Sequence, residues 1–104
     1  MIKQISVREL NDELSLGEIK LIDVREDDEL AICSVDSSTH IPMNKVPSSI
    51  DQFDKSTKYA IMCHSGVRSH NVCFYLQNQG FNVVNVQGGI HDWAQVIDKN
   101  MKTY

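Results

Sequence analysis

The sequence has 104 residues, of which 41% are hydrophobic and 23% are charged, and its formal net charge is -4. These values are typical of one globular domain and exclude a disordered chain. The negative charge argues against binding to nucleic acid or to an anionic membrane surface. Because residues 1–10 lack the apolar core of a signal peptide and no apolar run could span a bilayer, we expect a cytoplasmic protein.

The chain contains three cysteines, Cys33, Cys63 and Cys73. An odd number of cysteines cannot pair completely within one chain, and their spacing matches neither a CxxC motif nor a zinc-ligand repeat. We therefore expect free thiols in a reducing compartment. The histidines show no metal-ligand spacing either, so we expect neither a metal ion nor an organic cofactor.

Taken in chain order, the first half of the sequence predicts short strands that alternate with helices. Residues 3–5 suit an edge strand, and a capping-box pattern at Ser6 and Glu9 predicts a helix that ends near Gly17. The apolar run at residues 19–24 is typical of a strand buried on both faces. The segments that follow predict a short helical turn, a short strand ended by a proline and a helix, at residues 27–32, 40–43 and 46–53.

The second half continues the same alternation. Residues 58–63 predict a buried strand, and residues 69–79 a helix whose left-handed C-terminal cap is Gly80. A further strand at 81–86 and a final helix at 90–97, with Ile90, Trp93 and Ile97 facing inward, lead to a predicted tail at 98–104. This pattern predicts an α/β fold in a single domain spanning residues 1–104, with a mainly parallel sheet between helices.

The hexapeptide CHSGVR, residues 63–68, lies where a buried strand turns into a helix. In parallel sheets such points hold ligands, because successive backbone N–H groups and the helix N-terminus together attract anions. Gly66 allows a tight turn, and Arg68 adds a permanent charge with a planar donor fork.

The same surroundings would lower the pKa of Cys63 and favour its reactive thiolate form. A negatively charged persulfide on that thiolate would occupy the same cradle of N–H groups. Cysteine is also one of the most frequently buried residue types. The loop pattern alone therefore leaves two interpretations open, a nucleophile or ordinary packing.

Four segments resemble a known family in their order and spacing. They are LIDVRE (21–26), HIPM (40–43), CHSGVRS (63–69) and GFNVVNVQGGIHDWA (80–94). Together they resemble a single-domain rhodanese-like sulfurtransferase over residues 5–93. The resemblance implies a three-layer fold with a five-stranded, mainly parallel sheet.

For the site, the resemblance implies that Cys63 is the catalytic nucleophile. It would take a sulfane sulfur from thiosulfate or a persulfide and pass it to a thiol or to cyanide. The amides of a loop would cradle the sulfur, and Arg68 would orient the anionic group of the donor. The residues of this loop are His64, Ser65, Gly66, Val67 and Arg68. The alternative is a sulfur-carrier or partner-binding module without strong thiosulfate turnover.

Three further residues have predicted supporting roles. Asp23 and Arg25 would form a hydrogen-bond network at the end of a strand that supports the loop. Ser65 and Ser69 could donate hydrogen bonds to the persulfide or to the loop backbone, but a hydrogen bond at the start of a helix is the favoured role for Ser69. Cys73 is expected to be packing material. Cys33 is expected to be an ordinary thiol, although a redox regulator that forms a Cys33–Cys63 disulfide stays open.

The length and the charge of the loop at residues 63–68 bear on which substrate the site is expected to accept. Phosphatases and arsenate reductases on this fold resemble Cys-x5-Arg, whereas Cys63 and Arg68 are separated by four residues, which predicts a smaller cradle suited to sulfur. His64 and Ser65 stand where some thiosulfate-specific members carry two basic residues. Residues 33–43 also depart from the Gly-His-Ile-x-Gly-Ala stretch of many members, so the sequence leaves the physiological donor and acceptor open.

Overall fold

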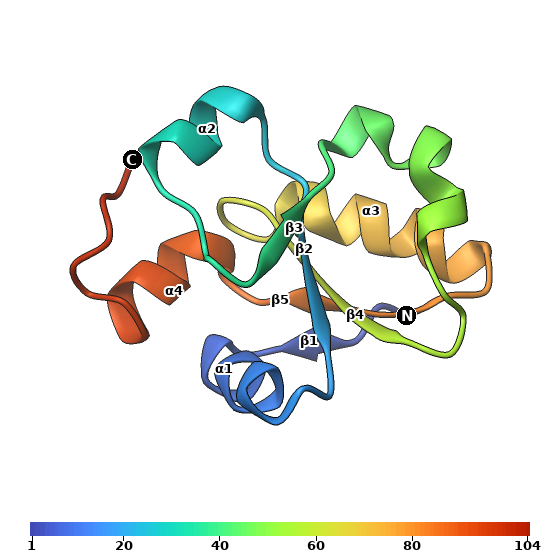
Figure 1. The fold of residues 1–104 in the computed structure, drawn as a ribbon, viewed down its shortest axis with the longest axis horizontal. Coiled ribbons are helices and arrows are strands. Elements are labelled where there is room, and N and C mark those ends of the chain that lie inside the picture. Colours follow the sequence, from blue (N-terminus) through green and yellow to red (C-terminus); the bar gives the residue numbers. More distant parts are fainter.

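One five-stranded sheet forms the centre of the molecule (Figure 1). The structure is a computed structural model and describes all of residues 1–104. The strands lie in the order β1-β5-β4-β2-β3, and every neighbouring pair is parallel. The prediction of an α/β fold with a mainly parallel sheet is therefore confirmed. The strand bounds are Gln4–Ile5 (β1), Lys20–Asp23 (β2), Ser38–His40 (β3), Lys58–Met62 (β4) and Asn82–Val86 (β5).

Helices cover both faces of this sheet, which gives the predicted three layers (Figure 1). The α-helices are Val7–Leu16 (α1), Asp27–Ile32 (α2), Val67–Asn78 (α3) and Gly89–Val96 (α4), and the 3-10 helices are Met43–Lys45 (η1) and Pro47–Gln52 (η2). On one face of the sheet, residues of α1 and α4 form a hydrophobic core. On the other face, residues of α3 form a second core together with Val46 and Phe53, which lie on either side of η2. None of these helices combines the length and apolar character needed to cross a membrane.

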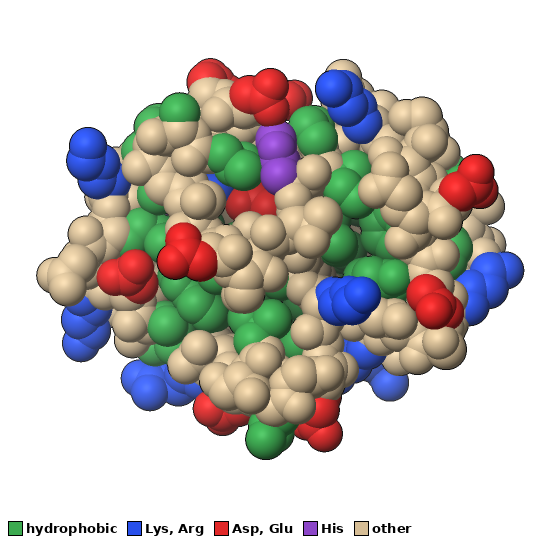
Figure 2. Space-filling model, viewed as in Figure 1, with side chains coloured by type: hydrophobic (Ala, Val, Ile, Leu, Met, Phe, Trp, Pro, Cys, Tyr) green, Lys and Arg blue, Asp and Glu red, His purple; other side chains and the backbone are tan.

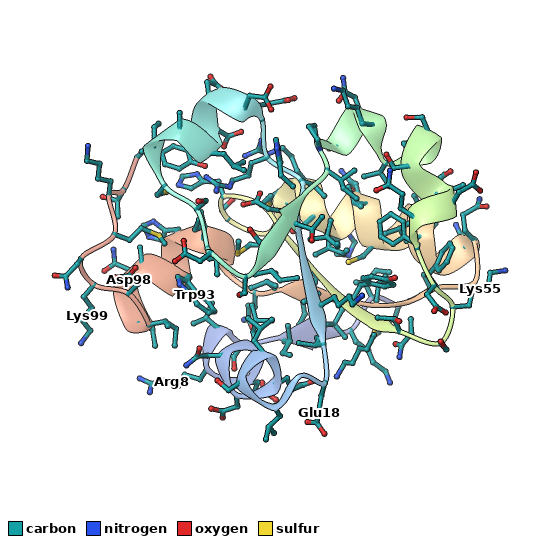
Figure 3. The ribbon with its side chains drawn as sticks, in the orientation of Figure 1. Arg8, Glu18, Lys55, Trp93, Asp98 and Lys99 are labelled. Atoms are coloured by element: carbon teal, nitrogen blue, oxygen red, sulfur yellow. The ribbon has the colours of Figure 1, made fainter.

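The two cores follow from the alternation of side chains along each strand. In β4, Tyr59 and Ile61 point into the core beneath α3, whereas Ala60 and Met62 point into the core beneath α1 and α4. Cys63 continues the alternation and belongs to the α3 core. Trp93 of α4, labelled in Figure 3, is buried as the sequence predicts, and it belongs to the opposite core.

Local signals placed several boundaries correctly. Ser6 and Glu9 form the predicted capping box at the start of α1, and Gly17 ends that helix with a φ of 71°. Gly80 follows the last turn of α3 with a φ of 94°, as expected of a left-handed cap. These features depend on residues close in sequence, so they could be predicted without knowing the fold.

Two elements differ from the sequence-based expectation. The strand predicted at residues 40–43 is wrong, because β3 lies at Ser38–His40 and Ile41 makes the last backbone hydrogen bond to β2, with Asp23. Pro42 is the N-cap of η1, and the N–H of Met43, the first residue of η1, donates to the carbonyl oxygen of Val24 at 3.0 Å. The helix expected at 46–53 is a 3-10 helix with Pro47 in its first turn.

Candidate active site

The loop of residues 63–68 lies at the carboxyl end of β4, the central strand of the sheet, and leads into α3. Helix α3 begins at Val67, two residues before the predicted start at Ser69, and Gly66 is its N-cap. The loop therefore occupies the position at which parallel α/β sheets bind ligands.

The sulfur of Cys63 is enclosed by hydrogen-bonding groups. Its side chain is only 1% exposed, and Sγ accepts a hydrogen bond from the backbone N–H of Gly66 at 3.1 Å. The hydroxyl oxygen of Ser69 lies 3.3 Å from the same sulfur. Burial opposes ionisation of this thiol, but hydrogen bonds from Ser69, Gly66 and Ser65 outweigh it and lower the pKa of Cys63 below its ordinary value.

A left-handed backbone at Gly66 makes this enclosure possible. Its φ of 107° is one that side chains with a Cβ rarely adopt, and an added Cβ would lie 3.5 Å from the carbonyl oxygen of Val86. This conformation turns the Gly66 N–H back toward Cys63. The glycine predicted to shape the loop is therefore required by the loop's geometry.

Asn85, which the sequence analysis did not single out, connects β5 to the loop. It is 3% exposed, and its Nδ2 donates to the carbonyl oxygen of Gly66 at 3.0 Å. Its Oδ1 accepts the hydroxyl proton of Ser69. The signal for this residue was a polar side chain inside the otherwise apolar segment 83–86, because buried polar groups normally have hydrogen-bond partners.

Ser69 occupies a different position in α3, and has different hydrogen-bond partners, from those predicted. No side chain caps the N-terminus of α3, so the expected helix-start hydrogen bond of Ser69 is wrong. Because α3 begins two residues earlier, Ser69 lies in its first turn, completely buried, with its hydroxyl between Cys63 and Asn85.

The start of α4 fixes the loop from a second direction. The N–H of Ile90 donates to the carbonyl oxygen of Cys63 at 2.9 Å, and the N–H of His91 donates to that of His64 at 3.0 Å. A Cβ on Gly89 would clash with both carbonyl groups. The second glycine of the Gly-Gly pair therefore allows the helix amides to approach the loop.

The structure places Asp23 and Arg25 in a buried network at the end of β2. Arg25 Nη2 donates to Asp23 Oδ2 at 2.8 Å and to the carbonyl oxygen of Cys33 at 2.8 Å, and both side chains of the ion pair are fully buried. Arg25 Nη1 donates to the carbonyl oxygen of Glu29 at 3.3 Å. These bonds join β2 to α2 and to the segment before β3, and none of them reaches Cys63.

Arg68 does not point freely into solvent. Its Nη1 and Nη2 donate to the two carboxylate oxygens of Glu29 in α2, at 2.6 and 2.8 Å. Tyr104, which lies within the segment predicted as a tail, donates its hydroxyl proton to Glu29 Oε2 at 2.6 Å. The sequence analysis named neither Glu29 nor Tyr104 as a site residue, and nothing local in the sequence distinguishes Tyr104.

The remaining loop residues lie toward the surface. The ring of His64 stacks on Tyr104 with centroids 4.2 Å apart, and Val67 is 70% exposed. Beside the loop is a polar cavity of about 470 Å³ whose lining includes Ser65, Gly66 and Asn85. Val67 is the one hydrophobic residue in the lining of this cavity.

The other two cysteines differ from Cys63 in their surroundings. Cys73 is fully buried in α3, and burial raises its pKa to about 12, so it stays a thiol at neutral pH. Cys33 packs in the core on the opposite face of the sheet from Cys63. All three cysteines are free, and no cluster of His, Cys, Asp and Glu side chains is arranged to hold a metal ion.

The fold and the loop place this chain in the class of parallel α/β proteins whose ligand sites lie at the carboxyl ends of the strands, here with a buried cysteine in the strand-to-helix loop. Within that class, the sequence-family model of the rhodanese-like domain matches residues 6–96 of this chain. The chain therefore belongs to the rhodanese-like domain family, as the resemblance implied.

Several relatives cover nearly the whole chain. YtwF of Bacillus subtilis, which is provisionally named a sulfurtransferase, is 44% identical over 88% of this chain and 90% of its own length. A protein of Allochromatium vinosum named sulfurtransferase is 33% identical over 91% of each chain. The crystal structure of a rhodanese-like domain protein from Staphylococcus aureus has a TM-score of 0.86 and 35% identity over 99% of each chain.

Proposed function

We propose that this chain is a sulfurtransferase that carries a sulfane sulfur as a persulfide on Cys63. The central observation is the hydrogen bond from the Gly66 N–H to a buried sulfur, at 3.1 Å, in surroundings that lower the pKa of Cys63. Membership of the rhodanese-like family and relatives named sulfurtransferase support the proposal.

In the loading step, the Cys63 thiolate attacks the outer sulfur of a donor. A new S–S bond forms to Cys63 while the S–S bond of the donor breaks. Thiosulfate would release sulfite, and a persulfide R–S–SH would release R–SH, with the persulfide proton moving to the leaving sulfur. In either case Cys63 holds a terminal sulfur with one negative charge, which the loop N–H groups can bind.

In the unloading step, a thiolate or cyanide attacks that terminal sulfur. The bond between the two sulfurs breaks, and Cys63 leaves as the thiolate. Hydrogen bonds from Ser69, Gly66 and Ser65 favour this thiolate, and a thiol of lower pKa leaves faster. The same contacts would therefore serve both halves of the reaction.

A second candidate is a sulfur carrier, or a partner-binding module, that turns over thiosulfate weakly. The observation that favours it is the pairing of Arg68 with Glu29, which leaves the guanidinium less available to an anionic donor. In both candidates the partners are a small-molecule or protein sulfur donor and a thiol acceptor. A reducing compartment such as the cytoplasm suits the three free cysteines.

The deciding experiment is the intact mass of the protein after incubation with thiosulfate, and separately with glutathione persulfide. We expect a gain of one sulfur atom that disappears on addition of cyanide. Cys63→Ser should abolish the gain, whereas Cys73→Ser, which alters a buried thiol outside the loop, should retain it. Loading by neither donor would refute the proposal, and loading without multiple turnover would favour the carrier.

A further inference from the structure

The guanidinium of Arg68 forms a bidentate ion pair with Glu29 across the active-site loop. The two N···O distances are 2.6 and 2.8 Å, and the Glu29 side chain is 15% exposed. Arg68 lowers the pKa of Glu29 to about 2, so the carboxylate is ionised at neutral pH. The permanent cation of the loop is therefore matched by a permanent anion.

Tyr104 holds Glu29 in this position. Its hydroxyl donates to Glu29 Oε2 at 2.6 Å and accepts from Arg25 Nη1 at 3.0 Å. Arg25 is completely buried and is bound at the same time to Asp23, so it is a rigid donor. Figure 1 shows the end of the chain lying beside α2, which is consistent with these contacts.

The electrostatic surroundings of the ion pair are acidic. Asp27, Asp28 and Glu29 all lie in the first turn of α2, and Figure 2 shows acidic side chains over this helix. Lys102 lines the small pocket beneath Tyr104, but it is exposed, so solvent and salt screen its charge. An incoming dianion would therefore meet a neutralised arginine next to a negatively charged helix.

Two classes of sulfur donor place different demands on such a site. Thiosulfate carries its charge partly on a sulfonate group that leaves as the sulfite dianion, and a free arginine would hold that group well. A persulfide R–S–SH leaves as a thiol, and the negative charge of its reacting group lies on the sulfur that is transferred. Only the first class needs a cation beyond the loop amides.

We propose that Tyr104 and Glu29 are positioning residues that set the donor class by keeping Arg68 paired, so that the site favours persulfides over thiosulfate. The inference rests on the proposed sulfurtransferase function. Glu29 supplies the neutralising charge, and Tyr104 keeps the carboxylate from rotating away from Arg68. Loss of either residue makes the guanidinium available to a sulfonate.

The test measures kcat and KM separately for thiosulfate and for glutathione persulfide, with cyanide as acceptor, on the full chain. We expect the unaltered protein to favour the persulfide at least tenfold in kcat/KM. Glu29→Gln should shift the ratio of the two kcat/KM values at least tenfold toward thiosulfate, mainly through a lower KM. Tyr104→Phe, which keeps the ring on His64, should shift it in the same direction by about threefold.

Asp27→Asn is the matched control, because it removes one charge from the same turn of α2 at a side chain that is 92% exposed and does not contact Arg68. It should leave the ratio within about twofold of the unaltered protein. A preference for thiosulfate in the unaltered protein, or unchanged ratios in both Glu29→Gln and Tyr104→Phe, would overturn this inference while leaving sulfur transfer intact. Failure of both donors to load Cys63 would instead overturn the proposed function itself.

Discussion

Ser69 donates its hydroxyl proton to Asn85 Oδ1, although its oxygen also lies 3.3 Å from the sulfur of Cys63. The positions of Oδ1 and Nδ2 in the Asn85 side chain are fixed, because Nδ2 donates a hydrogen bond to the carbonyl oxygen of Gly66. In the thiol form, the S–H of Cys63 therefore donates to Ser69, which donates to Asn85. When Cys63 ionises, its sulfur becomes an acceptor, and a hydrogen bond from the Ser69 hydroxyl to that sulfur requires the proton to leave Asn85.

Ser69→Ala should make Cys63 a weaker nucleophile. Removing the hydroxyl deletes a hydrogen bond that favours the thiolate, and bonds to charged groups contribute about 1.5–3 kcal/mol. The pKa of Cys63 should therefore rise, and alkylation by iodoacetamide at pH 7 should slow by about tenfold or more. Ser15→Ala, on the exposed end of α1, is the control. An unchanged pH profile of alkylation would show that Ser69 does not stabilise the thiolate.

Asn85→Asp should also raise the pKa of Cys63, for a different reason. A carboxylate would retain the Ser69 proton more strongly and would place a negative charge near the thiolate. The measurement is again the alkylation rate against pH, with thermal unfolding to confirm that the variant folds. Asn82→Asp makes the same change at an exposed position of β5 and should leave the profile unaltered. Faster alkylation of Cys63 at pH 7 in Asn85→Asp would contradict this coupling between Asn85, Ser69 and the pKa of Cys63.

Gly66→Ala should reduce both stability and reactivity. A side chain at a φ of 107° costs about 1–2 kcal/mol, and relieving that strain would move the N–H that points at Cys63. Gly17→Ala tests the backbone cost alone, since its φ is 71° and nothing lies within 4 Å of the added Cβ. Both variants should lose similar free energy of unfolding by urea denaturation, but only Gly66→Ala should slow sulfur loading. Equal loading rates would rule out a role for the loop geometry.

Glu29→Gln should lower stability in a pH-dependent way. The pKa of this carboxyl is about 2 in the folded chain against 4.5 ordinarily, because Arg68 binds the charged form. The stabilisation is therefore fully present above pH 4.5 and is lost as the pH falls toward 2. After allowance for the 36% exposure of Arg68, we expect a loss of about 1–2 kcal/mol at pH 7.

Urea unfolding at pH 7 and near pH 3 tests whether the stabilisation by Glu29 decreases as the pH falls. The difference in free energy of unfolding between the unaltered chain and Glu29→Gln should shrink at the lower pH. Asp27→Asn should show a much smaller difference at pH 7, since its side chain is 92% exposed. A gap that stays constant between the two pH values would mean that the Arg68 ion pair does not stabilise the fold.

The sequence by itself was sufficient for features that depend on near neighbours. The capping box at Ser6, the alternation in β4 and the thiol at a strand-to-helix turn all follow from residues a few positions apart. The boundaries of β3 and α3 were less accurate. The edge strand β3 ends at His40 and η1 begins at Met43, whereas Gly66 caps α3 so that the helix starts before Ser69.

Only the tertiary structure decided which groups surround the thiol. Ser69 and Asn85 are 16 residues apart, Arg68 and Glu29 are 39 apart, and Tyr104 and Glu29 are 75 apart. Parallel strand pairing brings β4 and β5 together, and the chain after α4 returns to α2. Long-range contacts of this kind follow from how the layers pack. The position of the Cys63 thiol at a strand-to-helix turn could therefore be predicted from the local pattern, whereas its hydrogen-bond partners and the pairing of Arg68 could not.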